Sequence, residues 1–286
     1  MTRAGDSRLL ALTVVAVAAL SWALLAWSAS GGGHGGFDHH SLGGHASPGA
    51  APEPHSHAAG AAPHSHAGFE SAAGLTSGAV AGVVAGWAVM VVAMMLPPAL
   101  PLLNCVRRLV AGRKHSGVLV AVGATSFVGV WTLAGIVLVV SDAALHQLSE
   151  RVTWLVAHPE LIAGSVLVGA GLYQFSPLKD ACLRACRTPR GFAAAHWRGR
   201  RSVEMEIATV AGAYAASCVG CCWALMAVSF AVGAAAMPVM VVLTVVMAAE
   251  RLARWGSRLV RPVGMGTASL GVVVALGLVP AGLLGV

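Results

Sequence analysis

Seven stretches of apolar residues, separated by short polar segments, set the pattern of this chain. They cover residues 9–27, 79–103, 118–140, 161–175, 207–231, 238–249 and 265–284. A helix needs about 20 such residues to cross a hydrocarbon core of ~30 Å, so the pattern predicts an all-α polytopic membrane bundle of about seven transmembrane helices. The fourth and sixth runs are short, and each either borrows flanking residues or is a re-entrant segment. Three prolines, Pro97, Pro98 and Pro101, predict a break or kink near the inner end of the second run.

The basic residues between the runs predict the orientation. With the N-terminus inside, all 18 Lys and Arg residues except Arg151 fall on the inner side, as the positive-inside rule requires. The C-terminus is then outside. Hydrophobic residues make up 57% and charged residues 10% of the chain, which is typical of a membrane protein. The net charge of +7 therefore points to orientation and contact with membrane lipid, and no nucleic-acid partner is expected.

This topology divides the chain into three parts. Residues 1–27 form an N-terminal transmembrane anchor or, alternatively, a signal peptide, since Arg3 and Arg8 precede an apolar run that ends in small residues. The length of that run favours an uncleaved anchor. Residues 28–78 form an extracytoplasmic loop, and residues 79–286 form a six-helix membrane domain.

The outer loop is rich in histidine. It has no Lys or Arg, holds eight of the 12 histidines, and its composition predicts disorder. Two near copies of a Pro-His-Ser-His-Ala unit place imidazoles in pairs, at His55, His57, His64 and His66. Such pairs bind Cu(II), Zn(II) or Ni(II) through neutral imidazole, and binding weakens below about pH 6. The loop is therefore either a metal-capture segment or a low-complexity spacer.

The six cysteines lie in the apolar runs or on the inner side, which indicates free thiols and argues against a disulfide framework. Three of them, Cys218, Cys221 and Cys222, fall within five residues of the fifth run. On a helix, Cys221 lies about 60° to one side of Cys218 and Cys222 about 40° to the other, so the three share a face. They are a packing cluster, a redox pair or a soft-metal site.

Methionines extend the sulfur pattern. In the second run Met90 and Met94 share a helix face, Met95 follows directly, and Met226 comes four residues after Cys222. Met90 and Cys218 both come out near the midplane when ~1.5 Å is counted per residue. Thioethers either fill an irregular core or, with thiolates, select Cu(I), for which two or three sulfur ligands suffice.

On the inner side, Cys182 and Cys186 lie four residues apart in a segment bounded by Pro177 and Pro189, which predicts a short helix. They either bind a thiophilic metal at the cytoplasmic mouth or pack as small residues. A different function, thiol–disulfide exchange, would use the pair Cys218 and Cys221. Its weakness is that no thiol is expected on the outer surface.

Three segments in order carry a resemblance to a known family. They are residues 87–98 (WAVMVVAMMLPP), residues 173–189 (YQFSPLKDACLRACRTP) and residues 220–226 (GCCWALM). They resemble a bacterial family of metal-binding integral membrane proteins that is similar to membrane copper chaperones of polyphenol oxidases. The resemblance covers roughly residues 79–251. It departs at Met237, where a Met-Asn pair is expected.

The resemblance implies a copper-handling protein of the bacterial cytoplasmic membrane, a chaperone or transporter more than an enzyme. The implied Cu(I) ligands are Met90, Met94, Met95, Cys182, Cys186, Cys218, Cys221, Cys222 and Met226. With the histidines of the outer loop, this leads to the hypothesis that copper is captured outside, held on the midplane thiols, and then translocated or delivered to an extracytoplasmic copper enzyme or chaperone.

Overall fold

The computed structural model describes residues 2–29, 77–151, 158–231 and 236–278 of the 286-residue chain. These ranges contain ten α-helices and one 3-10 helix, and no strand occurs among them, so the expected all-α fold is confirmed. The elements are α1 (Thr2–Ala29), α2 (Ser77–Met95), η1 (Pro97–Ala99), α3 (Leu100–Leu109), α4 (Ser116–Glu150), α6 (Pro159–Tyr173), α7 (Pro177–Arg187), α8 (Pro189–His196), α9 (Val203–Ala231), α10 (Ala236–Leu252) and α11 (Gly256–Ala275).

Each predicted apolar run, as far as it is described, lies in a helix. Within the described ranges, three helical segments are long and apolar enough to cross a membrane: Ser7–Ser28, Ser116–Ser141 and Val203–Ser229. The number rises to five if two bent helix pairs each count as one span. Several apolar helices are therefore compatible with a membrane protein, while the count of seven spans and the orientation of the termini stay predictions.

Proline determines where the bent pairs break. The predicted break after Met95 is confirmed, because α2 gives way to η1 and α3 and the two parts of the pair are bent by 56°. The pair α6 and α7 bends by 63°. Here the Ser176 hydroxyl accepts a hydrogen bond from the Lys179 backbone N–H (3.1 Å), and Pro177 occupies the first helical position. The expected short helix between Pro177 and Pro189 is therefore present as α7.

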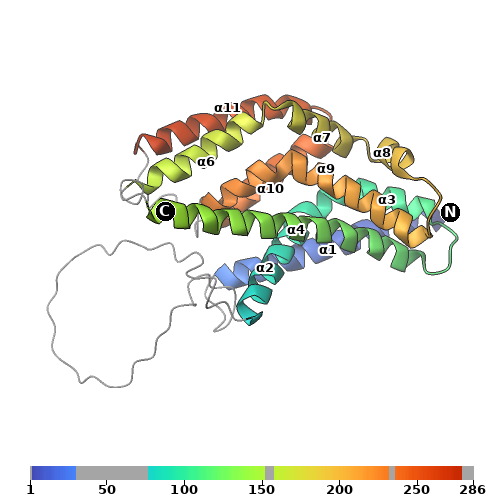
Figure 1. Ribbon diagram of the computed structural model, residues 1–286. Coiled ribbons are helices and arrows are strands. Elements are labelled where there is room, and N and C mark those ends of the chain that lie inside the picture. The colour runs from blue at the N-terminus through green and yellow to red at the C-terminus, as the bar shows by residue number, and fades with distance from the viewer. Residues whose placement is uncertain (1, 30–76, 152–157, 232–235, 279–286) are drawn as a thin grey trace, which may run out of the picture.

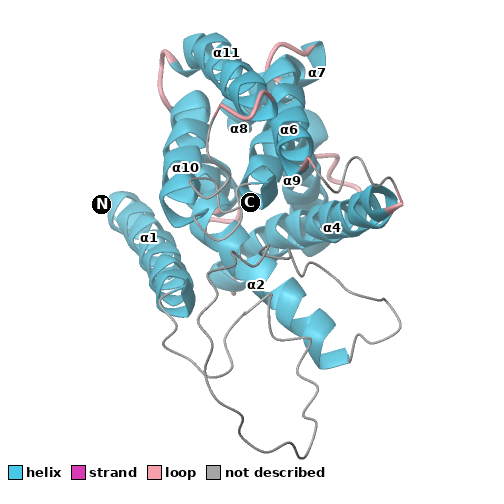
Figure 2. Cartoon of the chain, turned by 90° about the vertical axis from the view of Figure 1, so that its left-hand side faces the viewer, coloured by secondary structure: helices cyan, strands magenta, loops and turns pink. Residues whose placement is uncertain are grey.

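Helix α9 lies at the centre of the bundle. It packs along α4 on one side and against α7 and α6 on the other, and α8 and α10 also contact it (Figure 1). Helix α1 lies at the edge of the bundle, where it packs on α2 (Figure 2). Helix α4 continues through Glu150, ten residues beyond the end of its apolar run at residue 140. The central position of α9 brings elements from most of the chain next to its cysteines.

Helices α6 and α11 run side by side at very close range (Figure 1). A Cβ atom added at Gly271 would lie 2.6 Å from the Val168 backbone nitrogen, and one added at Gly171 would lie 2.5 Å from the Ala268 backbone nitrogen. Such contacts are possible only without a side chain. Small residues at a helix interface permit this approach, which is also typical of helix pairs in membranes.

Candidate metal centre

The candidate metal centre forms where α7 meets the middle of α9. The thiols of Cys218, Cys221 and Cys222 project from α9 into the core and are at most 1% exposed. Cys186, near the C-terminal end of α7, is 4% exposed and approaches them from the facing helix. The bend before Pro177 makes this possible, because it turns α7 away from the direction of α6.

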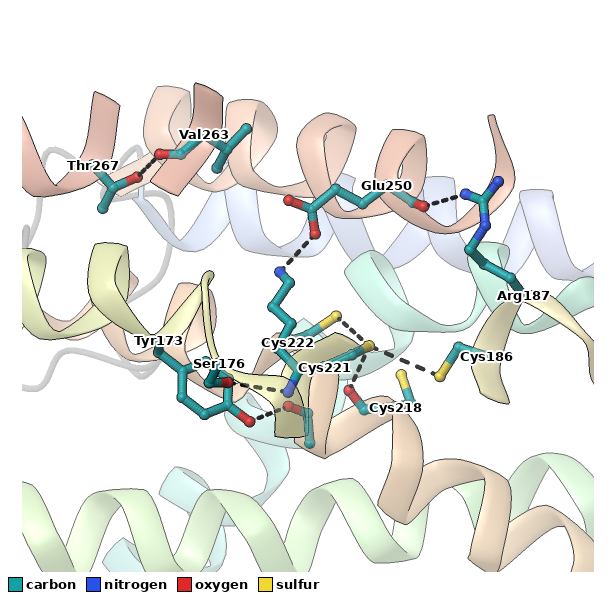
Figure 3. A network of polar contacts seen from close by, with 12 residues as sticks. Tyr173, Ser176, Cys186, Arg187, Cys218, Cys221, Cys222, Glu250, Val263 and Thr267 are labelled. Carbon is teal, nitrogen blue, oxygen red and sulfur yellow. Dashed lines mark hydrogen bonds and ion pairs between the residues drawn. The ribbon is translucent and has the colours of Figure 1, made fainter. Parts of the chain in front are cut away.

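Three sulfur atoms come together closely enough to share an ion. The Sγ atoms of Cys186, Cys218 and Cys221, called the thiol triad below, all lie within 4.8 Å of one another. A metal–sulfur bond of about 2.3 Å would place three trigonal sulfurs about 4.0 Å apart, so the triad fits one metal ion. The Cys221 and Cys186 sulfurs are 3.8 Å apart, and the Cys222 sulfur lies 3.2 Å from that of Cys221 (Figure 3). All six cysteines fall in the described ranges, and each is a free thiol there.

Two tyrosines fix the backbone around the triad. The Tyr214 hydroxyl, on α9, donates to the Cys186 carbonyl of α7 at 2.6 Å. The Tyr173 hydroxyl, at the end of α6, donates to the Gly220 carbonyl of α9 at 2.5 Å (Figure 3). Each bond crosses between helices and ends on or next to a cysteine. The Tyr214 bond therefore holds α7 on α9, and the Tyr173 bond holds the end of α6 on α9, in addition to side-chain packing.

A buried arginine stands beside the four thiols. Arg251 of α10 is 4% exposed, and it interacts electrostatically with Cys186, Cys218, Cys221 and Cys222. Its Nη1 donates to the Met95 sulfur at 3.7 Å, while Nε and Nη2 make no hydrogen bond within the described residues. A buried charge is costly unless it is compensated. Deprotonation of neighbouring thiols would balance the charge of Arg251, and the guanidinium would in turn stabilise these thiolates.

An ion pair docks α7 onto α10. The ammonium of Lys179 lies 2.7 Å from the Glu250 carboxylate, and both side chains are 1% exposed. The Arg187 guanidinium donates to the Glu250 carbonyl at 2.5 Å (Figure 3). It also donates to the Arg254 carbonyl at 3.2 Å. Both ends of α7 are thus tied to the helix that carries Arg251. This arrangement places Arg251 against the triad.

The other sulfur ligands expected from the sequence are placed as follows. Met90, Met94 and Met226 are buried in the same hydrophobic core as the triad, and Met95 is linked to it through Arg251. Cys182 is half-buried and also faces α9, because a Cβ added at Gly220 would lie 2.6 Å from its sulfur. It lies outside the group of three. The histidines His55, His57, His64 and His66 fall outside the described residues.

Sequence reasoning separated two groups that the structure unites. Cys182 and Cys186 were expected either to bind a metal at the inner mouth or to pack as small residues, whereas Cys186 lies against Cys218 and Cys221. The contributions of Arg251, Tyr214 and Lys179 were also missed. Charged residues at the ends of apolar runs are the available signal, but nothing in a single sequence says which helices meet.

Comparison with known proteins bears on the identity of the metal. No curated protein and no solved structure matches the chain. A family model described as PpoB2, a copper chaperone, matches residues 84–274, a segment that spans α2 to α11 and includes the whole thiol triad. Because this match covers well over half of the chain, the protein belongs to the PpoB2 copper chaperone family.

Proposed function

We propose that the protein binds Cu(I) at the thiol triad and passes it on, either by delivery to a partner or by translocation across the membrane. The observation that carries this proposal is the meeting of three buried sulfurs from two helices within 4.8 Å. Membership of a copper chaperone family supports it independently.

The chemistry of the triad favours Cu(I) over other ions. Thiolate ligands select soft ions, whereas Zn(II) in a structural site takes four ligands that often include histidine. Within the described residues, no histidine belongs to the group of three. The buried guanidinium of Arg251 adds a positive charge beside the site, and this charge disfavours a divalent ion more than a monovalent one.

Neighbouring sulfurs supply a route to and from the triad in this proposal. Cu(I) would exchange through two further thiols and four thioethers of the surrounding core. The thiols are those of Cys222 and Cys182, and the thioethers are those of Met90, Met94, Met95 and Met226. Their burial in one core supports such a path.

The outer loop forms one entrance in the proposed scheme. His55, His57, His64 and His66 capture copper there, and zinc or nickel compete for the same imidazoles. An extracytoplasmic copper enzyme or chaperone is the proposed receiver. The duplicated His-X-His unit supports this role.

Metal analysis of the full-length protein purified in detergent tests the triad. A triple variant, Cys186→Ser, Cys218→Ser and Cys221→Ser, should lose the sulfur-coordinated copper that X-ray absorption detects in the wild type. Cys105→Ser is the matched control, since Cys105 lies on α3 and is not part of the triad. Equal sulfur-bound copper in the triple variant and the control would contradict the proposal.

X-ray absorption spectra also distinguish copper bound by the outer loop from copper bound by the triad. Replacing the four paired histidines by alanine should remove nitrogen ligation and leave sulfur ligation intact. A spectrum unchanged by the histidine substitutions would show that the loop does not bind the metal.

Thiol–disulfide exchange is the second candidate because the Cys218 and Cys221 sulfurs lie within 4.8 Å of each other. Its test is thiol trapping in intact cells. A Cys218–Cys221 disulfide that forms and disappears with oxidant and reductant, together with unchanged copper content in the triple variant, would favour redox chemistry over copper handling.

A further inference from the structure

A cavity of about 830 Å³ opens beside the thiol triad. Its walls come from five helices, and each contributes one arginine: Arg8 from α1, Arg108 from α3, Arg187 from α7, Arg190 from α8 and Arg251 from α10. Cys186 also lines it, so one sulfur of the triad faces the cavity. Among the described residues that line the cavity, none is an aspartate or a glutamate.

The arginines lead from the surface to the triad. Arg8, Arg108 and Arg190 are exposed, Arg187 is half-buried, and Arg251 is buried next to Cys186. Two donor atoms of Arg251, Nε and Nη2, make no hydrogen bond within the described residues. The inner end of the cavity thus combines a positive charge, unused hydrogen-bond donors and the thiol of Cys186.

We propose that this cavity receives copper as an anionic complex, in which Cu(I) is bound to a small thiol that also carries carboxylates. The inference rests on the proposed copper function of the triad. It adds a second route to the triad, separate from the outer loop, and the chemical form in which the ion arrives on the side where Arg108 and Arg190 are exposed.

Charge is the first argument for an anionic carrier. Five guanidinium groups repel a bare Cu(I) ion and attract a complex with net negative charge, since walls of one sign raise the local concentration of the opposite sign. Guanidinium also binds carboxylate through paired hydrogen bonds, which fixes the orientation of the ligand. The cavity volume falls within the range of about 300–1,000 Å³ that is typical of small-molecule sites.

Transfer from such a carrier is a ligand exchange at Cys186. The copper–sulfur bond to the carrier breaks as a bond to the Cys186 sulfur forms, and copper stays Cu(I) throughout. The proton of the Cys186 thiol passes to the sulfur of the carrier, which leaves as a thiol. Cys218 then replaces the second carrier thiolate in the same way, so each carrier thiolate that leaves takes the proton of one incoming thiol.

Copper transfer from two matched donors tests the proposal. One donor is Cu(I)–glutathione, and the other is Cu(I) bound to the glutathione diethyl ester, which has the same thiol and no free carboxylate. The variant is Arg108→Gln with Arg190→Gln in the full-length protein. The control is Arg113→Gln with Arg258→Gln, two exposed arginines that do not line the cavity.

The double cavity variant should slow loading from Cu(I)–glutathione by about tenfold or more, because each lost charge-assisted carboxylate contact weakens binding. Loading from the ester should be equal in the variant, the control and the wild type. Restoring the charge with Arg108→Lys and Arg190→Lys should recover part of the rate.

Two results would overturn the cavity proposal alone: equal loading of variant and wild type from glutathione, or a loss of rate that appears only in vesicles with anionic lipid. The second would assign the arginines to lipid headgroups. If neither donor loads the wild type, the proposed function of the triad itself fails.

Discussion

Three buried charged side chains lie on two of the helices that surround the triad, α7 and α10. Lys179, Glu250 and Arg251 are almost completely buried, yet each has charged or polar neighbours from another helix. The sequence presents Glu250 and Arg251 as adjacent opposite charges at the end of an apolar run. In the structure the carboxylate pairs with Lys179 of α7, and Arg251 turns to the sulfurs. Adjacency in the chain was therefore a poor guide to pairing.

Removal of Lys179 alone should strongly destabilise the protein. Lys179→Met leaves the Glu250 carboxylate buried without its partner, and breaking a buried pair in this way costs about 3–5 kcal/mol. The free energy of unfolding in detergent, measured by denaturant titration, checks this. The double variant Lys179→Met with Glu250→Leu should recover much of the loss, since it removes both charges.

The exposed pair of Asp180 and Arg184 on the same helix provides the control. Arg184→Ala should cost less than about 1 kcal/mol, because solvent screens exposed pairs. An equal loss for Lys179→Met and Arg184→Ala would show that burial of the Lys179–Glu250 pair has no energetic consequence.

The presence of the apolar helices was the most predictable feature of the fold, and their ends were less predictable. Apolar runs located every described helix that is rich in hydrophobic residues, although α4 ends ten residues after its run and α11 begins nine residues before its run. Prolines located the break after Met95 and both ends of α7. Contacts between helices were not predictable. Cys186 reaches Cys218 because α7 turns by 63° from α6, and an angle of this kind depends on packing that one sequence does not encode in its periodicity.

Because α6 and α11 pack so closely, one added methyl group between them should markedly lower the stability of the protein. In Gly271→Ala the new Cβ would meet backbone atoms of α6 at 2.6–2.8 Å, so the helices must separate. Overpacking of this kind costs about 1–3 kcal/mol. The change should lower the thermal unfolding temperature in detergent.

Gly266→Ala, on the same helix, is the matched control because nothing lies within 4 Å of its added Cβ. This substitution should be neutral or stabilising, since alanine is favoured over glycine in a helix by up to about 1 kcal/mol. Equal unfolding temperatures for the two variants would argue against close packing of α6 on α11.

At the scale of the whole molecule, the distribution of basic residues predicts a topology that can be tested. The cavity arginines belong to the set that the sequence places on the inner side, and the His-rich residues 28–78 are expected outside. The division into an anchor, an outer loop and a six-helix domain also depends on this topology.

Labelling of introduced cysteines in intact cells should reveal the orientation. A membrane-impermeant maleimide should modify Ser56→Cys and Gly285→Cys without permeabilisation, and Ser202→Cys only after it. The unsubstituted protein gives the background from native thiols. Labelling of Gly285→Cys only after permeabilisation would mean an even number of spans and would contradict the prediction of seven.

Because the cysteines of the triad come from two helices, binding of an ion would restrict the movement of α7 relative to α9. Cys186 belongs to α7 and Cys218 to α9, so an ion held by both acts as a crosslink between segments 32 residues apart. If the ion stabilises one arrangement of α7 and α9, then that arrangement in turn binds the ion more tightly. A partner that moves α7 away from α9 would therefore lower the affinity for the ion without offering a competing ligand. Conversely, loss of the ion would weaken the contact between α7 and α9.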